Sequence, residues 1–216
     1  MTDRICIIGA SGFGREVMDV ATTQGYREFA FLEMHEGLDP IEEFPVWLDT
    51  PERVAELAAD GWHFAIGVGA PQHRRKIAER MRECVFPALI HPDSSFGRNQ
   101  AEAARGVAGL FVSAGVRMTN NIRLGRHTLF NLNVTVGHDT IVDDYAAMMP
   151  GVNISGNVHL GEGCYIGTGA SVINGDNEVK LAVGAFSTVG AGAVVVREVP
   201  PGTTAVGVPA KVLAAR

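Results

Sequence analysis

The chain has 216 residues, which is enough to bury the core of one large domain or of two small ones without cross-links. Its 18 basic and 24 acidic residues give a formal net charge of -6, and no basic run offers a surface for nucleic acid. A single short apolar run at residues 5–8 and three well-separated cysteines favour a reduced, cytoplasmic protein without membrane insertion.

The first part of the chain alternates between predicted strands and predicted helices. Residues 4–8 form an apolar strand, a glycine turn follows at 9–14, and residues 15–24 have helical character. Further strands are predicted at 29–32, 63–66 and 86–90, and further helices at 51–59 and 71–82. Such alternation is typical of a parallel sheet. We therefore predict a small Rossmann-like α/β domain over residues 1–92.

The glycine turn is a candidate phosphate site, although its order is GxxGxG and not the stricter GxGxxG. The N-terminus of the following helix can receive an anion. Glu33 lies where dinucleotide folds place an acid on ribose hydroxyls. About ninety residues are too few for two mononucleotide halves, so a nucleotide sugar fits better than NAD. The candidate substrate contacts are Gly9, Ser11, Gly12, Phe13, Gly14 and Glu33. Two alternatives stay open. The glycine turn can serve only the chain geometry, and Glu33 can be an exposed acid at the end of a strand.

The second part of the chain repeats with a period of six. From Val112 to Val172 every sixth residue is apolar, and neither the helical period nor the strand period sustains such a series. Residues four positions later are mostly small or β-branched, and Gly or Asn often stands at the corners. After Val172 the series resumes at Val183, which predicts an insertion near residues 176–180. We predict a parallel β-helix over residues 93–216, built from three short strands per coil.

The repeat sequences themselves resemble a known family. Residues 160–165 (LGEGCY), 166–171 (IGTGAS), 189–194 (VGAGAV) and 207–211 (GVPAK) resemble bacterial hexapeptide-repeat acyltransferases. The closest resemblance is to the family of sialic acid O-acetyltransferases and UDP-4-amino-sugar N-acetyltransferases. It covers nearly the whole chain, because that family also opens with a GASGxG-type α/β domain and continues through LIHP, here residues 89–92. The resemblance implies a left-handed β-helix, acetyl-CoA as co-substrate, no metal, and a homotrimer with sites between subunits.

The resemblance also assigns the catalytic residues. The family's histidine coil matches the segment from Asn131 through Val134 to His138 and Asp139, and His138 points outward because it follows the inward Val136 by two positions. The resemblance implies that His138 is the general base, that Asp139 orients its ring, and that the backbone amide of Gly156 stabilises the oxyanion. Acetyl-CoA contacts are expected from Gly156, Gly167, Thr168, Gly190, Ala191 and Lys211, and a substrate contact from Asn131.

Three departures from the family concern the substrate and acetyl-CoA. Glu33 is followed by Met34 and His35, where relatives often have a pair of acidic residues. Phe13 stands where many relatives have histidine, and Ala146 and Ala147 stand where relatives often carry a second histidine. His127 and His159 also project outward by the repeat register, but they lack the sequence context of His138. A zinc hydrolase on this fold would need three imidazoles around one metal, and the histidine spacing does not provide them.

The leading hypothesis is an acetyl-CoA-dependent N-acetyltransferase acting on the amino group of a nucleotide-linked amino sugar. O-acetylation of a sugar hydroxyl, such as one of sialic acid, would use the same base and stays open. A trimeric binding protein that keeps the fold without catalysis is the non-enzymatic alternative.

Overall fold

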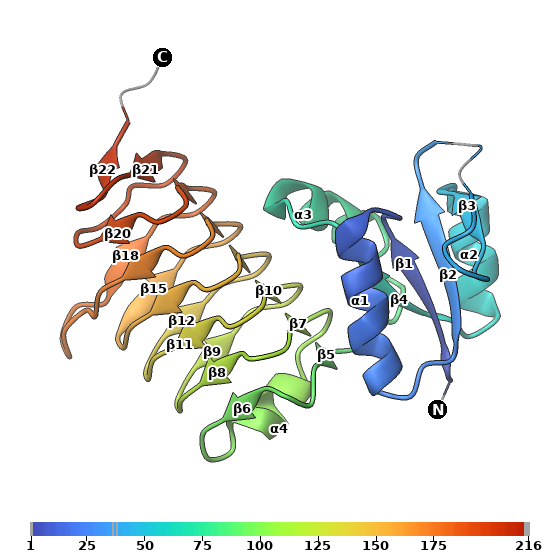
Figure 1. Cartoon of the computed structure of the whole chain (residues 1–216), viewed down its shortest axis with the longest axis horizontal. Helices are drawn as coiled ribbons and strands as arrows, with labels where there is room; N and C mark the ends of the chain where they lie inside the picture. Colours follow the sequence, from blue (N-terminus) through green and yellow to red (C-terminus); the bar gives the residue numbers. More distant parts are fainter. Residues whose placement is uncertain (1, 36, 38, 214–216) are drawn as a thin grey trace.

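The computed structural model describes residues 2–35, 37 and 39–213, and its two halves differ in architecture (Figure 1). The elements of the first half are β1 Arg4–Ile8, α1 Gly12–Thr23, β2 Glu28–Glu33, β3 Val46–Leu48, α2 Pro51–Ala59, β4 His63–Ile66 and α3 Pro71–Arg80. All four strands are parallel, in the order β3-β2-β1-β4, so the predicted parallel sheet is confirmed. Strand β3 escaped prediction because its apolar run, VWL, is only three residues long and half-exposed, which is too short to distinguish a strand from a loop. None of the described helices is long and apolar enough to cross a bilayer.

The alternation of side chains along β1 separates two apolar layers. Ile5 and Ile7 face the layer that contains α1, whereas Cys6 and Ile8 face the layer that contains α2 and α3. Helix α1 lies between the sheet and the second half of the chain (Figure 1). Helix α2 begins at Pro51, where the Thr50 hydroxyl caps the Arg53 N–H at 3.2 Å, as its sequence predicts.

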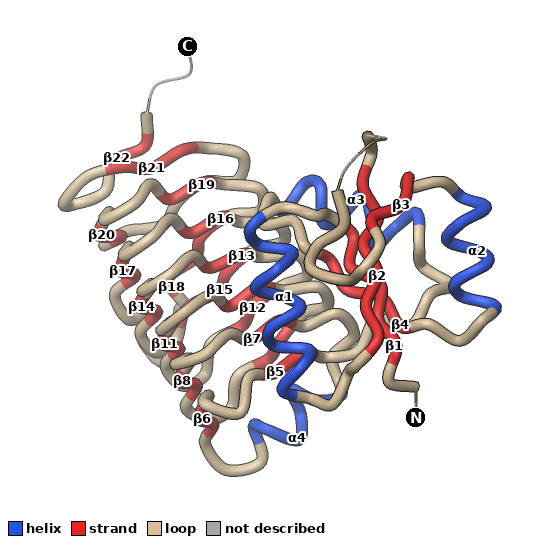
Figure 2. The backbone as a smooth tube through the Cα atoms, turned by 45° about the vertical axis from the view of Figure 1, so that its right-hand side comes forward, coloured by secondary structure: helices blue, strands red, loops and turns tan. Residues whose placement is uncertain are grey.

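The second half is a left-handed parallel β-helix (Figures 1 and 2). Its strands are β5 Leu89–Ile90, β6 Ser95–Phe96, β7 Phe111–Val112, β8 Arg117–Met118, β9 Arg123–Leu124, β10 Leu129–Phe130, β11 Thr135–Val136, β12 Ile141–Val142, β13 Ala147–Met148, β14 Asn153–Ile154, β15 Val158–Leu160, β16 Tyr165–Ile166, β17 Ser171–Val172, β18 Leu181–Val183, β19 Thr188–Val189, β20 Val194–Val195, β21 Thr204–Val206 and β22 Lys211–Val212. They form an eight-strand face (β5, β7, β10, β13, β16, β19, β21, β22), a six-strand face (β6, β8, β11, β14, β17, β20) and a four-strand face (β9, β12, β15, β18). Each regular coil advances by 18 residues, as from Leu129 to its partner Ala147.

The hexad register is confirmed in the core of the β-helix. The apolar frame from Val112 to Val172 is buried, with Leu124 alone partly exposed. Leu124 belongs to β9, the first strand of the four-strand face, so no earlier coil covers it. Helix α4, Gln100–Arg105, lies at this end instead. The Gln100 side chain donates to the Ile122 carbonyl and accepts from the Ile122 N–H, both at 2.9 Å, as a neighbouring strand would.

Of two predictions about where the repeat is interrupted or begins, one is confirmed and one is wrong. The insertion near residues 176–180 is confirmed, because Ser171 pairs with Val194, 23 residues further on, instead of the usual 18. The expectation that residues 86–90 end the α/β sheet is wrong. Leu89 and Ile90 form β5, which pairs with β7 and starts the eight-strand face. A short apolar run fits a buried strand of either architecture equally well, so the sequence does not separate them.

The two halves meet around the buried guanidinium of Arg74, on α3. Its Nε and Nη2 donate to the His127 carbonyl at 3.1 and 3.0 Å, while Nη1 donates to the carbonyls of Ile66 and Val68. His127 is 8% exposed, and its ring stacks on that of Tyr145. His127 therefore points outward from its coil, as expected, but the α/β domain covers it.

This burial makes stability depend on pH. Desolvation, followed by the charges of Arg74 and Arg126, lowers the pKa of His127 to about 4. Between pH 4 and pH 6.5 the unfolded chain then binds more protons at this site than the folded chain, so acidification destabilises the fold. The loss reaches at most about 1.4 kcal/mol per pH unit. A His127→Phe variant should lose less free energy of unfolding than wild type between pH 7 and pH 5 in urea titrations. Equal losses would contradict the assignment.

Candidate functional site

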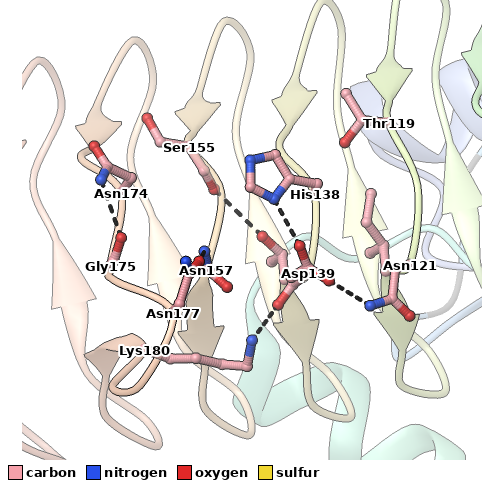
Figure 3. Close-up of polar contacts among 12 residues, drawn as sticks. Thr119, Asn121, His138, Asp139, Ser155, Asn157, Asn174, Gly175, Asn177 and Lys180 are labelled. Atoms are coloured by element: carbon pink, nitrogen blue, oxygen red, sulfur yellow. Dashed lines mark hydrogen bonds and ion pairs between the residues drawn. The ribbon is translucent and has the colours of Figure 1, made fainter.

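His138 lies at an open corner of the β-helix, two residues after β11 on the six-strand face and before β12 on the four-strand face (Figure 3). Its Nδ1 lies 2.7 Å from Asp139 Oδ2. An ionised carboxylate accepts only, so Nδ1 carries the proton and Nε2 presents a lone pair. The pair thus has the arrangement of a general base with an orienting acid.

The Asp139 carboxylate is held from a neighbouring coil (Figure 3). Asn121 donates from Nδ2 to Asp139 Oδ1, and Lys180 donates from Nζ to the Asp139 carbonyl. The hydrogen bonds from Asn121 and then His138 lower the pKa of Asp139 below its ordinary value. Asp139 therefore stays ionised at neutral pH and can stabilise a protonated His138.

Gly156 occupies the equivalent corner one coil later, directly against the imidazole. A Cβ on Gly156 would lie 2.6 Å from His138 Nε2, so the ring fits there only because residue 156 has no side chain. Within the part of the chain that the structure describes, the Gly156 N–H donates no hydrogen bond. The corner thus combines a proton acceptor with a free backbone donor.

A Gly156→Ala variant should keep the fold and lose activity. The backbone of Gly156 does not need a positive φ, so alanine is tolerated there. The added methyl group pushes the imidazole aside, and a displacement of about 1 Å can cost about 10²-fold in kcat. Steady-state kinetics beside thermal unfolding would check this. Wild-type kcat with an unchanged melting temperature would contradict the placement of the ring.

A second site lies in the α/β domain, at the carboxyl ends of its strands. A cavity of about 390 Å³ opens there, lined among others by Gly9, Glu33 and α3. Carboxyl ends of parallel strands are the usual ligand site of such sheets. The Glu33 carboxylate accepts from the N–H groups of Ala10 and Met34, at 3.1 and 2.9 Å, and so is fixed at the rim.

Comparisons with known proteins identify the family of this chain. Residues 4–81 match the model of the PglD N-terminal domain. A GDP-perosamine N-acetyltransferase of Escherichia coli is 36% identical over 151 residues, which make up 69% of this chain and 66% of that protein. The acetyltransferase domain of PglB from Neisseria gonorrhoeae is 31% identical, with a TM-score of 0.86 over 98% of this chain and 100% of that one. The chain belongs to the bacterial sugar acetyltransferase family.

Two further solved structures of acetyltransferases contain ligands. One is the same PglB domain in complex with acetyl coenzyme A, 30% identical with a TM-score of 0.85 over 99% of this chain and 100% of that one. The other is a variant of perosamine N-acetyltransferase from Caulobacter crescentus in complex with CoA and GDP-perosamine. It is 25% identical, with a TM-score of 0.85 over 98% of this chain and 97% of that one.

The remaining residues expected at the acetyl-CoA site, and the expected substrate contact Asn131, do not lie beside His138 within one chain. Asn131, Gly167 and Gly190 follow strands of the eight-strand face, so they share the corner at the opposite edge of the six-strand face. Thr168 and Ala191 continue that corner and are exposed. Lys211 lies in β22, the terminal antiparallel strand. One chain of this sugar acetyltransferase thus carries two separated sets of candidate residues. One set lies at the His138 corner, and the other lies at the corner that contains Gly167 and Gly190.

The residues of the predicted glycine turn also fall into two groups, one exposed and one packed inside the protein. Ser11 and Gly12 are exposed at the N-terminus of α1. Gly14 is buried, and a Cβ there would lie 2.1 Å from the Gly9 carbonyl oxygen, so this glycine allows the turn to pack. The Phe13 ring packs edge-on against Phe111 of the β-helix, with centroids 5.3 Å apart. A substrate role of Phe13 or Gly14 remains a prediction.

Two residues of the His138 corner were missed from the sequence. Asn121 stands 18 residues before Asp139, one regular coil, so the period could have found it. Lys180 lies in the insertion, where the repeat gives no register. The contact of Lys180 with Asp139 is therefore visible only in the folded structure.

Proposed function

We propose that this chain transfers the acetyl group of acetyl-CoA to the amino group of a nucleotide-linked amino sugar. The observation that carries the proposal is the corner at which His138, oriented by Asp139, lies against Gly156, whose N–H donates no hydrogen bond to any described residue. The relatives support it, since one is a GDP-perosamine N-acetyltransferase and another was solved with acetyl coenzyme A.

In this mechanism the amine attacks the thioester carbonyl while His138 Nε2 accepts the amine proton. The Gly156 N–H donates to the oxygen that becomes negative in the tetrahedral intermediate. Asp139 stabilises the imidazolium through its 2.7 Å contact with Nδ1. Collapse of the intermediate breaks the carbon–sulfur bond, and the imidazolium returns its proton to the CoA thiolate. The products are the N-acetylated sugar and CoA.

The active form in this proposal is a homotrimer. The two candidate sets of one chain lie at opposite edges of the six-strand face, so they cannot flank one ligand within a chain. In a closed ring with head-to-tail contacts, the Gly167 and Gly190 corner of one chain can meet the His138 corner of the next. Acetyl-CoA would then lie between neighbours. Light scattering should return three times the 23.0 kDa chain mass. A fully active monomer would exclude this arrangement.

The test of function is release of free CoA from acetyl-CoA with a panel of amino sugars linked to UDP or GDP. We expect turnover with at least one of them and an N-acetylated product by mass spectrometry. Acetylation of a sugar hydroxyl would instead support the O-acetyltransferase alternative. Absence of turnover with every amino and hydroxyl acceptor would favour the non-catalytic binding protein.

A further inference from the structure

Among the described residues that line the cavity of the α/β domain, Asp49 has a buried oxygen without a hydrogen-bond partner. Asp49 follows β3, and its side chain is 5% exposed. Asp49 Oδ2 accepts from Arg80 Nη2 at 2.6 Å. Asp49 Oδ1 is buried and has no hydrogen-bond partner among the residues that the structure describes. Both residues line the cavity of about 390 Å³.

A buried carboxylate oxygen without a donor is costly, so such atoms call for a missing partner. The other walls of the cavity indicate what that partner is. Ile8, Leu32, Val68 and Ile77 make apolar sides, and Lys76 adds a cation on α3. A volume of this size and a mostly apolar lining with a few polar groups are typical of small-molecule sites.

The polar groups form a pattern that matches the edge of a nucleobase. Asp49 Oδ1 is an acceptor, and the neighbouring Arg80 guanidinium carries only donors. The edge of a base presents an N–H donor beside a carbonyl or ring-nitrogen acceptor. A mostly apolar cavity lined by this pair of groups therefore suits a planar base better than a sugar, which has hydroxyl groups on all sides.

We propose that Asp49 and Arg80 bind the edge of the nucleobase of the nucleotide-linked sugar, with Asp49 Oδ1 accepting a hydrogen bond from a base nitrogen. This proposal rests on the function proposed above and names the residues that select the nucleotide. Glu33, at the rim of the same cavity, then lies beside the ribose.

Asp49→Asn is the decisive variant. The Arg80 donor keeps the amide oxygen on its side, so the amide NH₂ group takes the place of Oδ1 and an acceptor becomes a donor. The affinities of UDP, GDP, CDP and ADP for the full chain would be measured by calorimetry. We expect the diphosphate that wild type binds best to lose about 10- to 100-fold in affinity, and the preference among the four bases to shrink or change.

Asp60→Asn is the matched control. Asp60 also pairs with an arginine of this domain, Arg4 at 2.7 Å, but it does not line the cavity. Its variant should bind all four diphosphates like wild type. Equal weakening of the four by Asp49→Asn would mean that Asp49 only braces α3, and the proposal would fall. Unchanged affinity, or no binding of any diphosphate to wild type, would overturn it as well.

The two proposals can fail separately. Diphosphate binding is measured without acetyl-CoA, so it reports on the cavity whatever the reaction is. If diphosphates bind with Asp49-dependent base preference but no nucleotide-linked amino sugar releases CoA, the site stands and the proposed reaction is wrong. If transfer occurs, Asp49→Asn should raise KM for the nucleotide sugar and leave kcat and the KM for acetyl-CoA near wild type.

Discussion

Replacement of His138 by alanine is expected to lower kcat by about 10²–10⁴, the usual contribution of a general base. The variant leaves Asp139, the Gly156 N–H and the buried core in place, because the His138 side chain lies on the outside of the coil. Binding of CoA and the assembly state should therefore stay unchanged. Steady-state kinetics at saturating substrates would measure the loss, and light scattering would verify the assembly.

The structure offers a matched histidine as the control. His159 Nε2 lies 2.8 Å from Asp143 Oδ2 on the four-strand face, so it is also a half-exposed histidine paired with an aspartate. His159→Ala should keep kcat near wild type. His127 is unsuitable for this purpose, because its ring is buried between the two halves of the chain. If His138→Ala kept more than about a third of kcat, the proton acceptor would have to be another group.

The repeat made the β-helix predictable at the level of single residues. Burial in a coil depends on position within the hexad, so the inward frame could be read directly from Val112 to Val172. The ends of the β-helix could not be predicted in this way. Leu89 and Ile90 lie before the hexad frame, so nothing in the sequence indicates that they pair with β7. The helix α4 that covers the open end was missed for the same reason.

The candidate site was predictable only where the repeat or the family motif defines it. His138 and Gly156 lie one coil apart, so the contact between them follows from the period. The cavity residues Asp49 and Arg80 come from separate elements of the α/β domain, and no spacing rule joins them. Contacts between the two halves, such as the one from Arg74 to the His127 carbonyl, depend on how the domains dock and leave no signal in the sequence.

Replacement of Val142 by aspartate is expected to cause the largest loss of stability. Val142 points into the β-helix core and is 2% exposed. An aspartate there must either stay ionised without a partner or take up a proton, which at pH 7 costs about 4 kcal/mol from its ordinary pKa near 3.9. That is a large part of the 5–15 kcal/mol that stabilises a typical domain.

The neighbouring residue on the same strand provides the control for this prediction. Ile141 points outward between its strand partners Arg123 and His159, so an aspartate at position 141 meets solvent and the cationic Arg123 side chain. Ile141→Asp should melt near wild type, whereas Val142→Asp should melt about 10 °C lower or fail to accumulate as soluble protein. Because burial raises the pKa of the new carboxyl group, the deficit of Val142→Asp should shrink as the pH falls toward 4. Equal melting temperatures of the two variants at pH 7 would contradict the hexad register, since only that register places these adjacent side chains on opposite sides of the coil.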